Sequence, residues 1–220
     1  MKKILTLCII LFTGLFAVSC EKVIPENQEG QSNEEQKESG NEQNTAAPGK
    51  ILIAYYSYTG HSREIVTALT ANLADDLTAD VLEIKAADEN VDYNANNYKA
   101  GRDLLNAIDA NPNKASSYPG IKTVDKKAED YNTIIIVTPL WHSRMAAITQ
   151  TYLFQEGAKM KGKNIGLVVS SHSSGISGVE SDAKRLIPEG KFYASSLWIN
   201  NANHDKRADL VKDWLNTIGL

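Results

Sequence analysis

Hydroxyl side chains gather between residues 57 and 62, directly after an apolar run of strand length, Ile51 to Tyr56. One glycine there permits a tight turn, and the residues that follow place apolar side chains on one helical face. The first N–H groups of a helix have no partner within it and favour an anion. The segment therefore predicts a phosphate-binding loop without lysine, made of Ser57, Tyr58, Thr59, Gly60, His61 and Ser62. The alternative is that Ser and Thr act only as helix caps and turn residues.

Each of the four histidines follows a segment that we expect to form a strand: His61, His142, His172 and His204. The carboxyl ends of parallel strands meet at one edge of a sheet, so these side chains are expected to gather there. Histidine titrates near neutral pH and is a common proton donor or acceptor. Two alternatives remain. The four can be polar loop residues with no joint role, or His61, His142 and His172 can form a metal site, although a short spacing such as His-x-x-x-His is absent.

Strands and helices alternate along residues 50–220. Strands are expected at 50–57, 79–85, 133–138, 164–170 and 192–199, the third ending before Pro139. Helices are expected at 62–74, 95–110, 144–156, 178–187 and 205–218. The third and fourth strands are apolar throughout, which is typical of central strands covered on both faces. The pattern predicts the α/β class, a three-layer sandwich around a five-stranded parallel sheet with right-handed crossovers.

The first 49 residues do not read as part of this fold. Residues 1–20 combine two lysines, an apolar run and small residues before Cys20, which is typical of a secretory signal. The end of this run, Ala17 to Cys20, resembles the lipobox of bacterial lipoproteins and predicts lipidation of Cys20. An uncleaved anchor and a plain signal peptide are the alternatives. Residues 21–49 are acidic and poor in apolar residues, so we expect a disordered tether.

Composition excludes several classes of function. Residues 50–220 carry 19 Lys and Arg against 20 Asp and Glu, so no basic footprint for nucleic acid exists. Residues 21–220 contain no cysteine, which excludes disulfides, thiolate ligands and a thiol nucleophile there. Neither a Gly-x-Ser-x-Gly elbow nor a Gly-x-x-x-x-Gly-Lys-Ser/Thr loop occurs. Any redox chemistry must therefore use a bound cofactor.

Three motifs, in order, make residues 50–220 resemble the flavodoxin family. The first is the hydroxyl loop 57–62, the second is Thr138 to Met145, and the third is Ser170 to Gly175. The resemblance implies a sheet of order 2-1-3-4-5 and non-covalently bound FMN, with its phosphate in the first loop. The isoalloxazine would lie along the other two loops, at Pro139, Leu140, Trp141, His142, Ser143, Ser171, His172, Ser173, Ser174 and Gly175.

The second and third motifs depart from the family pattern. His142 replaces an aromatic residue, Ser143 a glycine and Ala146 a proline, and serines replace the paired glycines of the third loop. Family members use the glycine to reorient a peptide when the flavin takes up one electron. A serine makes this rearrangement harder, so strict one-electron carriage is not expected.

The resemblance implies an FMN-binding redox protein of the cell envelope, lipid-anchored to a bacterial membrane with its domain outside the cytoplasm. It would carry electrons or reduce small acceptors, and its partner would be a redox protein or a quinone-like molecule. His142 or His172 would supply a proton during two-electron transfer to a quinone-like or nitro-type acceptor. The alternative is a binding lipoprotein that kept the fold and no longer holds FMN.

Overall fold

The computed structural model of the protein describes residues 49–220. The expected signal peptide at 1–20, its lipidation residue Cys20 and all of the expected tether except Gly49 lie outside the described residues. Within residues 49–220, no helix combines the length and apolar character needed to cross a membrane.

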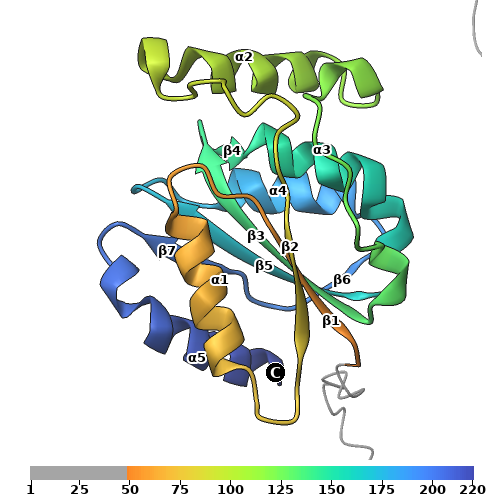
Figure 1. The fold of residues 1–220 in the computed structure, drawn as a ribbon, viewed down its shortest axis with the longest axis vertical. Helices are drawn as coiled ribbons and strands as arrows, with labels where there is room; N and C mark the ends of the chain where they lie inside the picture. Colours follow the sequence, from red (N-terminus) through yellow and green to blue (C-terminus); the bar gives the residue numbers. More distant parts are fainter. Residues whose placement is uncertain (1–48) are drawn as a thin grey trace, which may run out of the picture. The chain divides into compact units, whose positions relative to one another are not determined.

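A parallel β-sheet forms the middle layer of the domain (Figure 1). Its strands are β1 (Ile51–Tyr55), β2 (Ala79–Glu83), β3 (Thr133–Trp141), β5 (Asn164–Ser171), β6 (Lys191–Phe192) and β7 (Leu197–Asn200). The strand order is β2-β1-β3-β5, and both β6 and β7 pair with the outer edge of β5. The predicted order 2-1-3-4-5 is confirmed, because β6 and β7 together take the place of the fifth strand.

Helices cover both faces of this sheet. They are α1 (His61–Asn72), α2 (Ala95–Ala110), α3 (Ala147–Glu156), α4 (Ser177–Leu186) and α5 (Arg207–Ile218), with short 3₁₀ turns at Ala115–Ser117, Ala128–Asp130, Gly157–Met160 and His204–Lys206. Helices α1 and α5 pack together on one face, and α3 and α4 cover the other. Helix α2 lies beyond α3, at the top of Figure 1. The predicted three-layer sandwich is confirmed.

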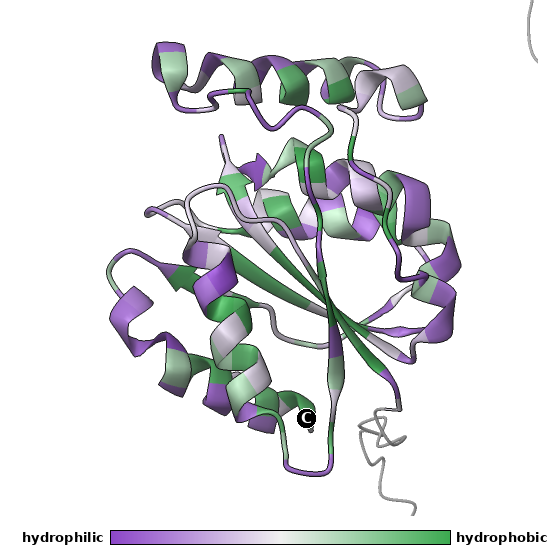
Figure 2. Cartoon of the chain, viewed as in Figure 1, coloured by the Kyte–Doolittle hydropathy of each residue, from purple (hydrophilic) through white to green (hydrophobic). Residues whose placement is uncertain are grey.

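The strands owe their stability to burial on both faces. Successive side chains of a strand point to opposite faces, so Leu52 and Ala54 pack with α3 and α4, whereas Ile51 and Ile53 pack with α1 and α5. Figure 2 shows hydrophobic strands at the centre of the domain, with hydrophilic residues on the helices around them.

The strand expected at 192–199 is interrupted. Phe192 pairs with Ile165 and Leu197 with Val168, so four residues of this chain segment face two of β5. The excess residues bulge away from the sheet, and the carbonyl of Ser195 instead accepts a hydrogen bond from Trp214 of α5. A single continuous strand was therefore a wrong prediction.

Two expected boundaries after the third strand also differ. Strand β3 continues to Trp141, because Pro139 still pairs with β5 and the next two residues pair with Arg144 and Met145. Strand β1 ends opposite Val137, so the side of Pro139 that faced β1 has no strand neighbour. A proline is tolerated at such an edge. The helix expected at 144–156 begins at Ala147, because Arg144 and Met145 form the short antiparallel strand β4 (Arg144–Met145) with the end of β3.

Candidate functional site

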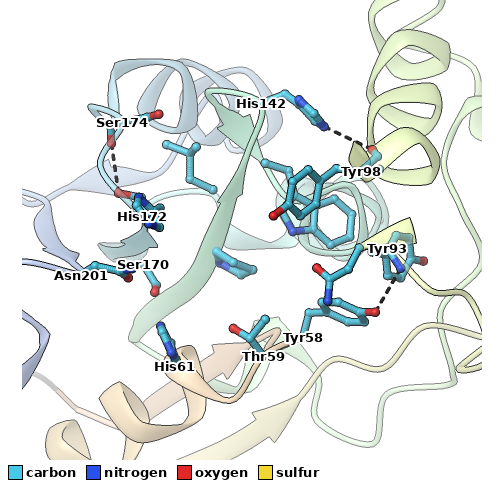
Figure 3. Close-up of a pocket in the computed structure, with 16 residues that line it drawn as sticks. Tyr58, Thr59, His61, Tyr93, Tyr98, His142, Ser170, His172, Ser174 and Asn201 are labelled. Carbon is cyan, nitrogen blue, oxygen red and sulfur yellow. Dashed lines mark hydrogen bonds between the residues drawn. The ribbon is translucent and has the colours of Figure 1, made fainter. Parts of the chain in front are cut away.

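A cavity of about 480 Å³ opens at the carboxyl edge of the sheet (Figure 3). Segments that follow β1, β3, β5 and β7 form its floor and sides, and the start of α2 forms an outer wall. This is the edge where the sequence predicted a ligand site. The cavity is lined by expected cofactor residues from all three motifs: Tyr58, Thr59, His61, Pro139, Leu140, Trp141, His142, Ser171, His172 and Ser174.

The remaining expected residues lie outside this lining. They are Ser57, Gly60, Ser62, Ser143, Ser173 and Gly175. Ser62 is buried, and the hydroxyl of Ser57 accepts a hydrogen bond of 3.3 Å from the backbone N–H of Arg63. The Ser57 hydroxyl therefore stabilises the loop and the start of α1, and neither serine lines the cavity.

The turn before α1 has the backbone expected of an anion-binding loop. Gly60 is the N-cap residue with φ of 96°, a value that favours glycine. No side chain of this residue caps the helix. Ser57 accepts from the Arg63 N–H, so the first-turn N–H groups of His61 and Ser62 are the ones a ligand can use. Thr59 and His61 on either side of Gly60 both line the cavity.

The hydroxyl of Tyr58 connects this loop to a segment that sequence reasoning missed. It donates to the Asp92 carboxylate at 3.0 Å and accepts from the Tyr93 backbone N–H at 3.1 Å. The Asn94 backbone N–H also bonds Asp92, at 2.9 Å. This N–H and the Tyr58 hydroxyl hold the pKa of Asp92 below its usual range. The segment lies in the long connection between β2 and α2 and carries no motif that would have identified it.

Further lining residues were also absent from the sequence prediction. They are Tyr93, Asn94, Tyr98, Gly101, Ser170 and Asn201. Ser170 begins the third motif but was not among the expected flavin contacts. Ser170 and Asn201 directly adjoin strand ends, so the rule that ligands lie at carboxyl ends could have found them. Tyr98 and Gly101 come from α2, whose position over the cavity depends on tertiary packing.

Trp141 is enclosed by aromatic and backbone groups from several segments. Its ring centroid lies 4.7 Å from that of Tyr93 and 5.7 Å from that of Tyr56. A side chain at Gly101 would come within 3.3 Å of the indole, so the glycine lets α2 approach it closely. Burial raises the pKa of Tyr56 and that of Tyr93. The result is an apolar aromatic wall along one side of the cavity.

His142 and Ser143 form the two-residue loop between β3 and β4. Their φ angles are 46° and 63°, both in the left-handed region, as a type I′ hairpin requires. The Ser143 carbonyl oxygen would lie only 2.0 Å from a Cβ placed on Gly178 of α4. The hairpin therefore packs directly on the backbone of α4.

An ion-pair network behind the hairpin holds it in place. Arg144 donates from Nε and Nη2 to the buried Asp182 of α4 at 2.8 and 2.5 Å, and from Nη1 to Asp109 of α2 at 2.7 Å. The Asp182 carboxylate raises the pKa of Arg144 above its usual value. Bidentate pairs of this kind fix orientation as well as position, so one arginine joins the hairpin to two helices.

The third motif is fixed by side chains of β5 and β7. The Ser171 hydroxyl accepts from Trp198 Nε1 at 2.8 Å and donates to the Ser174 carbonyl at 3.0 Å. The Asn201 backbone N–H donates to the His172 carbonyl at 3.1 Å. These bonds close the loop beside the cavity, although it has serines where the family pattern has paired glycines.

The histidines converge as predicted. His61, His142 and His172 all line the cavity, and His204 lies against His61 with 4.7 Å between ring centroids. Within residues 49–220, no group of three or more His, Cys, Asp or Glu side chains is placed to hold a metal ion.

The cavity suits FMN in the chemistry of its donors. One end offers N–H groups of a helix start with the Thr59 hydroxyl, which suit a phosphate. The middle is aromatic, which suits a flat conjugated ring. Among the described residues, the lining of the cavity contains no Lys, Arg, Asp or Glu.

Comparisons with known proteins agree with this arrangement. A family model described as flavodoxin matches residues 50–218. No curated protein matches the chain. Among solved structures, a protein from Bacteroides eggerthii assigned as a flavoprotein is 23% identical with a TM-score of 0.60, covering 78% of this chain and 99% of that one.

Two further solved structures share the fold. One, from Bacteroides uniformis and assigned as a flavoprotein, is 23% identical with a TM-score of 0.58, covering 76% of this chain and 98% of that one. A flavoprotein from Lactobacillus acidophilus, solved in complex with FMN, is 21% identical with a TM-score of 0.55, covering 73% and 99%. Since the family model spans nearly all of the described residues, the chain belongs to the flavodoxin family.

Proposed function

We propose that this protein binds FMN non-covalently and transfers electrons to small acceptors in the bacterial cell envelope. The observation that carries the proposal is the cavity at the carboxyl edge, where the Thr59–His61 turn and the aromatic wall lie in one continuous space. The FMN complex of the Lactobacillus acidophilus flavoprotein, which shares the fold, supports the choice of cofactor.

Bound FMN would supply two electrons to the acceptor. The N–H groups and the Thr59 hydroxyl would hold the phosphate, and the wall formed by Trp141 and Tyr93 would exclude water from one side of the ring. Reduction of a quinone to a hydroquinone also consumes two protons. His142 or His172, both facing the cavity, would deliver one proton to an acceptor oxygen, and solvent would deliver the other.

The hairpin places His142 for this role. Its Nε2 lies 3.4 Å from the backbone carbonyl of Tyr98 and can donate to it. The Arg144 network and the packing on Gly178 keep the residue at the mouth of the cavity. The backbone of His172 is fixed by the bond from Asn201 to its carbonyl. Two histidines from separately fixed loops therefore line the same space.

We place the domain outside the cytoplasm, tethered through lipid on Cys20 and the acidic segment 21–49. Nicotinamide nucleotides are expected to be scarce there. A redox protein or a membrane donor therefore suits the proposal better than a nicotinamide.

The rival function is a binding lipoprotein that has lost FMN. Its support is the replacement of glycines in the second and third motifs. In the third motif, the Ser171 hydroxyl donates a hydrogen bond to the Ser174 carbonyl. In the second motif, the Ser143 backbone packs closely on Gly178. The loops thus remain closed despite the substitutions, which favours FMN binding over its loss.

Anaerobic reduction of the full chain loaded with FMN tests the proposal. We expect bound flavin to accept two electrons without a long-lived one-electron state, and menadione to reoxidise it. Replacing His142 or His172 by Ala should slow reoxidation in at least one of the two variants. Unchanged rates in both variants would remove the histidines from the proposal, and a chain that binds no FMN would favour the rival.

A further inference from the structure

Tyr98 lines the cavity with a solvent-exposed aromatic ring. Its residue is 55% exposed and is one of two exposed large hydrophobic residues in the described chain. It lines the cavity from the α2 side, close to His142 (Figure 3). Most other aromatic residues around this space are packed on each other. The Tyr98 ring is therefore free to contact a ligand.

The backbone that carries Tyr98 is strained. Asn96, Asn97 and Tyr98 have φ of 50°, 55° and 60°, which makes one left-handed turn before the regular part of α2. Asparagine tolerates this region, but tyrosine enters it at a cost. Strain of this kind persists when the surrounding structure enforces it, and it commonly marks a functional position.

Two contacts hold the turn in this conformation. Arg102 Nη2 donates to the Asn97 carbonyl at 2.6 Å, and His142 Nε2 lies 3.4 Å from the Tyr98 carbonyl. The rings of Tyr98 and His142 are edge-on, with centroids 6.5 Å apart. Both contacts use backbone carbonyls of the turn, so the ring of Tyr98 is positioned without being covered.

The charge of the cavity indicates which ligand this ring would take. Its lining contains Tyr, Trp and His side chains but no Lys, Arg, Asp or Glu. An acceptor with its own carboxylate or ammonium group would find no counter-ion there. A flat, uncharged aromatic molecule has no charge to bury, so it avoids this free-energy cost and is stabilised by stacking.

We propose that Tyr98 is a specificity-determining residue that stacks on a neutral planar aromatic acceptor, of the quinone class, at the mouth of the cavity. The inference rests on the proposed function and adds to it the residue that selects the acceptor. The strained turn holds the ring at the position where the acceptor enters, beside the imidazole of His142.

Equilibrium dialysis of menadione against the oxidised, FMN-loaded full chain tests the inference, since no electron transfer occurs under those conditions. Tyr98→Ala should weaken menadione binding about 2- to 10-fold, the range expected for one aromatic contact. Tyr98→Phe should bind as the wild type does, because stacking needs only the ring. Val81→Ala, which removes the other exposed hydrophobic side chain, on β2, is the matched control.

FMN affinity is measured in the same samples by fluorescence quenching and should be unchanged in every variant. Equal menadione binding by Tyr98→Ala and wild type would overturn the inference while leaving the proposed function intact. Loss of FMN from Tyr98→Ala would also overturn it, because the ring would then belong to the cofactor site. A wild-type chain that holds no FMN would contradict the proposed function itself.

Discussion

Individual residues make this site with hydroxyls, backbone N–H groups and aromatic rings instead of charged side chains. The hydroxyl of Tyr58 makes two hydrogen bonds, because it donates to Asp92 and accepts from the backbone N–H of Tyr93. The loop at residues 57–62 and the outer wall of the cavity therefore depend on one another. A change at this hydroxyl should affect stability and ligand binding together.

Tyr58→Phe tests that link. The variant keeps the ring but leaves the Tyr93 N–H without its acceptor, so we expect a loss of about 1 kcal/mol in the free energy of unfolding. FMN binding should also weaken, because the loop loses its support. Urea unfolding and flavin fluorescence measure the two effects. Tyr98→Phe, on the exposed ring, serves as control, and equal behaviour of the two variants would contradict the linking role.

At the scale of elements, helix α4 and the His142–Ser143 hairpin form one packed unit. A methyl group at Gly178 would collide with the Ser143 carbonyl, whereas one at Gly175 would meet open space. Gly178→Ala should therefore destabilise the protein by about 1–3 kcal/mol, although alanine normally favours a helix. Gly175→Ala is the control. Thermal unfolding in which Gly178→Ala matches or exceeds the wild type would contradict the packing.

The left-handed turn at the start of α2 makes a second prediction at this scale. In an ordinary helix, alanine is about 1 kcal/mol more stable than glycine. At Tyr98 the order should reverse, with Tyr98→Gly more stable than Tyr98→Ala by about 1 kcal/mol, because glycine accepts positive φ without cost. Denaturant titration of both variants measures the sign. Greater stability of the alanine variant would show that residue 98 is helical.

Sequence patterns predicted the elements well where local rules decide them. The apolar runs of β1, β3 and β5 indicated the strands of the sheet, and the hydroxyl loop after β1 indicated one end of the cavity. The sheet order came from the resemblance to the flavodoxin family. The interruption between β6 and β7 was not predictable, because it depends on Ser195 reaching Trp214 of α5. The position of α2 was likewise missed, since it depends on Gly101 packing on Trp141, distant in sequence.

For the whole molecule, we propose that lipid on Cys20 anchors the flavodoxin-family domain to a membrane. Cys20→Ser should remove the lipid and move the protein from the membrane fraction to the soluble fraction of a lysed bacterium. The folded domain should remain intact, with the same FMN content per chain. Fractionation followed by immunoblotting measures the shift. A variant that stays in the membrane fraction would contradict lipidation at this residue.

FMN binding in the cavity at the carboxyl edge is the proposal on which the proposed electron transfer depends. The most direct measurement is a fluorescence titration of FMN with flavin-free full chain, repeated with riboflavin, which lacks the phosphate. We expect saturable quenching of FMN fluorescence at one flavin per chain. Riboflavin should bind more weakly, since the N–H groups of α1 and the Thr59 hydroxyl are proposed to bind the phosphate. The absence of quenching at micromolar FMN, or equal affinity for the two flavins, would contradict it.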